Sequence, residues 1–195
     1  MAHADEIAVW NFNDNDLIVD HGAGTLTTNF VPANVVFFSG SSLNARQGDA
    51  AGNALSLQGG ANNQNNGRNI TFSVSTLGLT DIRVSFATQR TATGFGTDQF
   101  QYSTDGVTFF NHTLYVPGTS FAAFTFNLSS ITALNNNPNV TFRIIFNGAS
   151  SELGNNRIDN LVVDGTTPEP ATILLLGTSL FGLCAKMRHR LRCRQ

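Results

Sequence analysis

Apolar and polar residues alternate along most of the chain, and this alternation predicts β-strands. In the clearest stretches the apolar side chains stand two residues apart, which is the period of a half-buried strand. These stretches are Ile70–Val74, Ile82–Phe86, Phe100–Tyr102, Phe124–Leu128 and Val140–Phe146. Shorter candidates are Ile7–Phe12, Thr25–Phe30, Val35–Ser39, Ala54–Leu57, Val107–Phe110 and Ile158–Val163. No segment before Pro168 keeps a helical period over three turns.

Clusters of Gly and Asn separate these strands and predict turns, because both residues accept left-handed backbone conformations. Asp105-Gly106 between apolar flanks is the clearest hairpin signal. Many short strands at this spacing predict an all-β fold, an antiparallel β-sandwich over residues 5–165. Jelly-roll topology is favoured over an immunoglobulin-like one because no Cys and Trp framework is present.

The pattern changes after the predicted sandwich. Residues 171–185 carry no charge and would span about 22 Å as a helix. This is shorter than a bilayer core of about 30 Å, but flanking residues with snorkelling side chains could close the gap. The tail at 186–195 alternates Lys186, Arg188, Arg190, Arg192 and Arg194 with other residues. We therefore predict a single C-terminal transmembrane helix with a cytoplasmic tail and an exported body. A buried core helix that ends in a solvated basic turn is the alternative.

Pro168-Glu169-Pro170, the apolar run and the Arg-rich end follow one another in this order. The region 166–195 therefore resembles the sorting signal of PEP-CTERM proteins. The resemblance implies that an exosortase, a membrane transpeptidase, cleaves near the triplet and removes the helix and tail. The precursor would pass through the inner membrane, and the mature protein would lie at the cell surface or in the extracellular matrix, associated with exopolysaccharide and biofilm.

The N-terminus carries a weaker targeting signal. Ala2-His3-Ala4 has the small-x-small pattern of a signal-peptidase site. We interpret residues 1–4 as the remnant of a signal-peptide cleavage region, and a chance match is the alternative.

Charge is divided unevenly between the two parts. Residues 1–170 hold six arginines, no lysine and all thirteen acidic residues, a net charge of −7. Nucleic-acid binding requires clustered cations, so nucleic acid is excluded as a partner. Both cysteines, Cys184 and Cys193, lie in the predicted discarded segment, so the mature body has no disulfide.

The body begins with Trp10-Asn11-Phe12-Asn13 and ends with Arg157-Ile158-Asp159-Asn160. In this it resembles jelly-roll modules of secreted bacterial proteins, whose fold is shared with many carbohydrate-binding modules. The resemblance implies extracellular polysaccharide as a partner, although a shared fold does not transfer a ligand.

Aromatic residues are the candidates for sugar stacking. Phe109, Phe110 and Tyr115 surround the predicted hairpin, and one of two adjacent strand residues must face outward. Anchoring of the loop on the core is the alternative for them. Trp10 alternates with Ala8 and Phe12, which favours a place in the core.

Aspartates suggest a metal. Asp14, Asp16 and Asp20 crowd the loop after the first strand, and Asp159 lies in the last strand. First and last strands of a sandwich are often neighbours, so Asp14, Asp16 and Asp159 could bind a structural calcium ion, which takes about six to eight oxygen ligands. The spacing is not that of an EF-hand, and a solvated acidic turn is the alternative.

Catalytic motifs are absent from the sequence of the body. The histidines of residues 5–165 are His21 and His112, and no Gly-x-Ser-x-Gly or His-Glu-x-x-His pattern occurs. The sequence thus predicts a non-enzymatic, exported β-sandwich with a structural or carbohydrate-binding role. A secreted hydrolase is the alternative.

Overall fold

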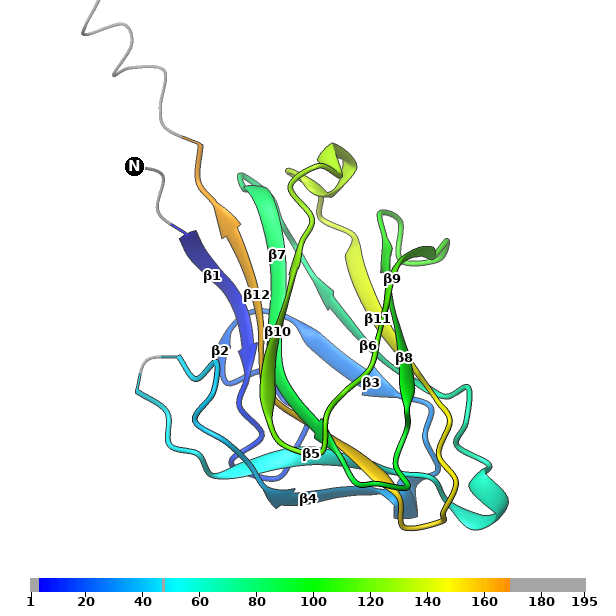
Figure 1. Cartoon of the computed structure of the whole chain (residues 1–195). Coiled ribbons are helices and arrows are strands. Elements are labelled where there is room, and N and C mark those ends of the chain that lie inside the picture. Colours follow the sequence, from blue (N-terminus) through cyan, green and yellow to red (C-terminus); the bar gives the residue numbers. More distant parts are fainter. Residues whose placement is uncertain (1–3, 47, 169–195) are drawn as a thin grey trace, which may run out of the picture.

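The computed structural model describes residues 4–46 and 48–168, which form two antiparallel β-sheets packed face to face (Figure 1). The seven-stranded sheet has the order β10-β7-β12-β1-β2, and β5 also pairs with β12 while β4 pairs with β5. Its strands are β1 (Ala4–Trp10), β2 (His21–Gly22), β4 (Val35–Ser39), β5 (Asn53–Gln58), β7 (Thr80–Arg90), β10 (Ala122–Asn127) and β12 (Asn155–Thr166). The prediction of an all-β antiparallel sandwich is confirmed.

The five-stranded sheet has the order β3-β6-β11-β8-β9. Its strands are β3 (Thr25–Thr28), β6 (Asn69–Val74), β11 (Val140–Asn147), β8 (Thr97–Ser103) and β9 (Phe110–Tyr115). Three short 3-10 turns, η1 (Pro32–Asn34), η2 (Ala61–Asn63) and η3 (Thr132–Leu134), lie in the connections.

Strand alternation builds the core between the sheets. In β6, Ile70, Phe72 and Val74 are buried, and the intervening Thr71 and Ser73 are only partly buried. Trp10 is fully buried and meets Phe72 edge to face, with ring centroids 6.0 Å apart. Its expected place in the core is confirmed, and this edge-on geometry is a favourable one for aromatic pairs.

The first and last strands are neighbours, as expected. Strand β1 pairs with β12 from Ala4↔Thr166 to Trp10↔Leu161. The register of β12 against β7 shifts after Asp159, where Asn160 adopts a positive φ of 49°. Asn tolerates this conformation better than most residues. The Asp159-Asn160 pair contacts the loop after β4: Ser41 N–H donates to the Asp159 carboxyl, and the Asn160 amide donates to the Ser41 and Leu43 carbonyls.

The region of the hairpin departs from the sequence prediction. Strands β8 and β9 do pair as a hairpin, and Gly106 has the expected positive φ of 76°. The strand predicted at Val107–Phe110 is wrong, however, because residues 104–109 form the connecting loop and β9 begins at Phe110. The carboxylate of Asp105 accepts hydrogen bonds from the Val107 and Thr108 N–H groups, which holds this segment as a turn.

Both ends of the described chain leave the sandwich at the same end (Figure 1), because Ala4 lies opposite Thr166 in the sheet. The predicted transmembrane helix at 171–185 and the basic tail at 186–195 lie outside the described residues, as do Glu169 and Pro170. Within residues 4–46 and 48–168, no helix has the length and apolar character needed to cross a membrane.

Candidate functional site

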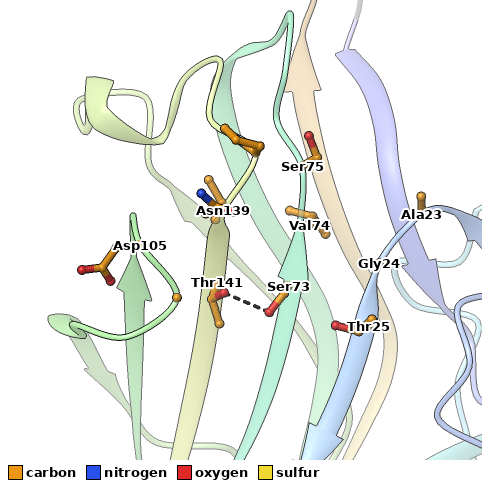
Figure 2. Close-up of a pocket in the computed structure, with 12 residues that line it drawn as sticks. Ala23, Gly24, Thr25, Ser73, Val74, Ser75, Asp105, Asn139 and Thr141 are labelled. Carbon is orange, nitrogen blue, oxygen red and sulfur yellow. Dashed lines mark hydrogen bonds between the residues drawn. The ribbon is translucent and has the colours of Figure 1, made fainter.

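An open trough of about 440 Å³ lies across the five-stranded sheet, near the end where β6 finishes and β11 begins (Figure 2). We call it the hydroxyl trough. Its lining residues are Ala23, Gly24, Thr25, Ser73, Val74, Ser75, Asp105, Gly106, Pro138, Asn139, Val140 and Thr141.

The floor of the hydroxyl trough is a row of side chains from adjacent strands. Thr25 on β3 lies opposite Ser73 on β6, and Ser73 lies opposite Thr141 on β11. The hydroxyls of Ser73 and Thr141 are hydrogen-bonded at 2.9 Å, as Figure 2 shows. The residues that flank this row along the strands, such as Phe72 and Phe142, point into the core, so the row lies on the opposite, outer face of the sheet. Within the row, Thr25 is exposed, Ser73 is partly buried and Thr141 is 5% exposed. Each hydroxyl can donate and accept hydrogen bonds.

The loop of the β8–β9 hairpin forms one wall of the trough. Asp105 is the acidic residue of the lining, but the N–H groups of Thr108 and Val107 and the Ser103 hydroxyl all donate to its carboxylate. These hydrogen bonds, that of Thr108 first, lower the pKa of Asp105 well below its usual range. Figure 2 shows its carboxylate pointing away from Thr141. The wall therefore presents mainly backbone to the trough.

A second outward row runs beside the first. Arg143 lies two residues after Thr141 on β11, with Thr71 on one side and Gln101 on the other. Its Nε donates to Gln101 Oε1 at 2.7 Å, and Gln101 Nε2 donates to Asn111 Oδ1 at 2.7 Å. The guanidinium carbon lies 3.7 Å from the centroid of the Phe109 ring, a cation–π contact. Partial burial lowers the pKa of Arg143, although arginine stays charged in proteins.

The three aromatic candidates do not form one surface. Phe110 is 48% exposed and stacks on Tyr102 with centroids 5.6 Å apart, while Phe109 is half-buried under Arg143. Tyr115 differs from the expectation, because it is buried in the core. At the end of β9 the alternation directs its ring inward, where it packs against Phe86, Phe124 and Phe126. It presents no ring face to a ligand.

The aspartates of the calcium prediction differ in their burial and in their hydrogen-bond partners. Asp14 is exposed, and Asp16 accepts a hydrogen bond from the Ile18 N–H. Asp159 is buried, where it accepts hydrogen bonds from Ser41 N at 2.6 Å and Asn160 N at 2.9 Å. Within the described ranges, no group of three or more His, Cys, Asp or Glu side chains is positioned to hold a metal ion. Calcium binding stays a prediction.

Burial gives Asp159 an unusual electrostatic position. Loss of solvent raises the pKa of this carboxyl to about 7, against the lowering effect of its two backbone hydrogen bonds. An added Cβ at Gly40 would lie 2.4 Å from Asp159 Oδ2 and 2.5 Å from the Ala51 carbonyl. The loop after β4 thus packs directly on the carboxyl, and a side chain at position 40 would not fit.

Sequence reasoning missed the hydroxyl trough and the Arg143 row. The available signal was the polar half of each alternating strand, which includes Thr71, Ser73, Thr141 and Arg143. The strongest single clue was Arg143, a cation between the regularly spaced apolar residues of Val140–Phe146. Which polar positions would lie side by side depends on strand order, and no local pattern encodes that order.

Comparison with known proteins bears on the C-terminal sorting signal and, separately, on the fold. The model of the PEP-CTERM protein-sorting motif matches residues 166–190, so this chain carries that sorting signal from the last residue of its last strand onward. No curated protein matches the chain.

Among solved structures, the chain resembles the tandem of CBM22 domains from Paenibacillus barcinonensis Xyn10C. The identity is 11%, the match covers 87% of this chain and 48% of that one, and the TM-score is 0.52. It also resembles TmCBM61, solved with beta-1,4-galactotriose (13% identity, 78% and 92% coverage, TM-score 0.46). A third match is the K2 cleaved adhesin domain of Lys-gingipain (12% identity, 74% and 89% coverage, TM-score 0.46). At these identities the likeness concerns the fold alone, a jelly-roll β-sandwich of the kind found in carbohydrate-binding modules.

Proposed function

We propose that the protein is exported, held transiently in the inner membrane by its C-terminal segment, and released by an exosortase to the cell surface or extracellular matrix. The position of the sorting motif supports this proposal. It begins at Thr166, which is the last residue of β12, and Pro168 is exposed. Cleavage beyond Thr166 would therefore remove no strand of the sandwich and would leave the core intact.

We further propose that the sandwich binds a carbohydrate chain, such as an extracellular polysaccharide of a biofilm. The observation that carries this proposal is the hydroxyl trough, an open surface whose floor is the Thr25, Ser73 and Thr141 row. Sugar hydroxyls both donate and accept hydrogen bonds, and Ser and Thr hydroxyls match both roles. The fold likeness to carbohydrate-binding modules is consistent with this role.

We infer that the trough binds without catalysis. Hydrolysis of a glycoside requires two carboxyl groups placed on either side of the bond in most families. Among the described residues that line the trough, Asp105 is the acidic one, and its carboxylate is engaged by the loop. His112, which lies on β9, packs edge-on against Phe100 and Phe126 and not in the trough.

The test is glycan binding by the wild type and by the double variant Ser73→Ala with Thr141→Val. Each lost hydrogen bond to a sugar is worth about 0.5–1.5 kcal/mol, so we expect the dissociation constant to rise about tenfold or more. Thr125→Val is the matched control, because Thr125 is exposed on β10 of the other sheet. Binding that is equal in all three proteins would place the ligand elsewhere, and no binding to any glycan would leave a structural matrix role.

A further inference from the structure

Arg143 is held in a fixed orientation beside the hydroxyl trough. The Phe109 ring lies under its guanidinium, and Gln101, itself bonded to Asn111, accepts from its Nε. Contacts on one ring face and one edge fix the plane of a guanidinium. A planar group fixed in this way loses little further entropy when it binds a ligand.

Among the residues that the structure describes, no neighbour balances the charge of Arg143. Within residues 4–46 and 48–168, no carboxylate lies within 4.0 Å of its guanidinium, and no acceptor meets its terminal Nη groups. Arg46, in contrast, forms an ion pair with Asp164 at 3.0 Å. Arg68 donates to the Asn29 and Gln64 carbonyls, and Arg90 donates to the Pro117 carbonyl. The Arg143 guanidinium therefore retains unused N–H donors.

These donors lie on the same sheet face as the trough. Arg143 and Thr141 are two residues apart on β11, so their side chains point to the same side about 7 Å apart. A sugar bound at the Thr141 end of this row would therefore have Arg143 as its neighbour along β11. The two rows together offer hydroxyl groups for sugar hydroxyls and a guanidinium for an anion.

We propose that the ligand of the trough is an acidic polysaccharide and that Arg143 selects it by binding a uronate carboxylate. This inference rests on the proposed carbohydrate-binding function. A carboxylate matches the paired N–H donors of a guanidinium. The body has a net charge of −7 up to residue 170, which repels polyanions at long range, but screening confines that repulsion to about 8 Å at physiological ionic strength. Selection of an acid must therefore come from a local contact.

The test compares trigalacturonate with its methyl ester, which is neutral and nearly identical in shape, by titration calorimetry at physiological salt. We expect the wild type to bind the acid at least tenfold more tightly than the ester. Arg143→Gln should weaken acid binding about 10- to 100-fold and change ester binding less than twofold. Arg68→Gln is the matched control, because Arg68 is a partly exposed arginine that donates only to backbone carbonyls.

Arg143 also anchors Phe109, so a structural effect must be separated from a binding effect. Arg143→Lys keeps the charge but loses the paired donors, and we expect it to lose most of the preference for the acid while its melting temperature stays close to that of the wild type. Equal weakening of acid and ester binding in Arg143→Gln would show that Arg143 only holds the hairpin, and would overturn the inference.

Three other outcomes also decide between the proposals. Binding of the ester without preference for the acid would leave the proposed function standing and overturn the acidic ligand. Tighter binding of a sulfated oligosaccharide than of trigalacturonate would overturn the assignment to uronates. If no probe of any charge binds, the proposed function fails and this inference fails with it.

Discussion

The buried carboxyl of Asp159 should make the stability of the sandwich depend on pH. In the folded protein its pKa is raised from 3.8 to about 7 because burial disfavours the charged form. Below pH 3.8 the group is protonated in both the folded and the unfolded state. As the pH rises, the unfolded chain ionises first, so the folded state loses stability until the pH passes about 7.

The size of this loss follows from linkage. Over the interval in which only the folded state holds the proton, each pH unit lowers the free energy of unfolding by about 1.4 kcal/mol. From pH 3.8 to about 7, the loss is on the order of 3–4 kcal/mol. That is a substantial part of the roughly 5–15 kcal/mol that stabilises a typical domain.

Asp159→Asn isolates this contribution. The amide is neutral at every pH, and its oxygen can accept from only one of the Ser41 and Asn160 N–H groups that the carboxylate oxygens now meet. The variant should therefore be less stable than the wild type at pH 4, by about 1–3 kcal/mol. Near pH 8 the wild type has lost the contribution of its protonated carboxyl, and the variant should be equally or more stable.

The assay is urea unfolding of residues 1–168 at pH values from 4 to 8 and constant ionic strength. Glu152→Gln, which removes an exposed carboxylate, is the control for general charge effects. Parallel pH profiles for the wild type and Asp159→Asn would refute the reasoning. Adding Ca²⁺ extends the test, since an ion that binds the ionised carboxylate should stabilise the wild type at pH 8, by about 2.7 kcal/mol at a hundredfold excess over Kd. Absence of any calcium effect would remove the metal prediction.

Two further predictions concern the sorting signal and the core. Replacement of Pro168-Glu169-Pro170 by alanines should leave the unprocessed chain in the inner membrane. Intact-mass analysis of surface-extracted protein should then find no mature form. Unchanged release would contradict the sorting interpretation. Trp10→Ala removes a fully buried ring that contacts Phe72, so the free energy of unfolding should fall by about 3–5 kcal/mol, measured by urea unfolding. Val107→Ala, at a side chain that is 81% exposed, is the control and should change stability by less than about 0.5 kcal/mol.

The sequence predicted the strands best where apolar residues recur at every second position. In β6 and β11 every second residue is apolar and is buried in the core. The other face of β11 is less regular, because Thr141 is also buried and Ile145 is apolar but only partly buried. Strand β9 was misplaced because it is an edge strand, whose Asn111, His112 and Thr113 break the alternation. Side chains on an edge strand contact fewer neighbours, so their pattern is less constrained.

The candidate site was harder to predict than the fold. Phe109 stood out as an aromatic residue near a hairpin, but its role depends on Arg143, which lies 34 residues away in sequence and contacts the ring. Tyr115 was chosen for the same reason and is buried. Aromatic character alone does not distinguish a ring that faces solvent from one that fills the core.

The sequence by itself determined the sorting signal of this protein and the half-buried character of its strands. The sorting motif and the two-residue period are local properties, which a short segment expresses whatever the rest of the chain does. Only the tertiary structure decided which strands are neighbours. The pairing of β6 with β3 and β11 joins residues 25, 73 and 141 into one row, and the β8–β11 pairing sets Gln101 beside Arg143. Such contacts depend on burying the apolar faces of all strands in one core, which is a property of the whole chain.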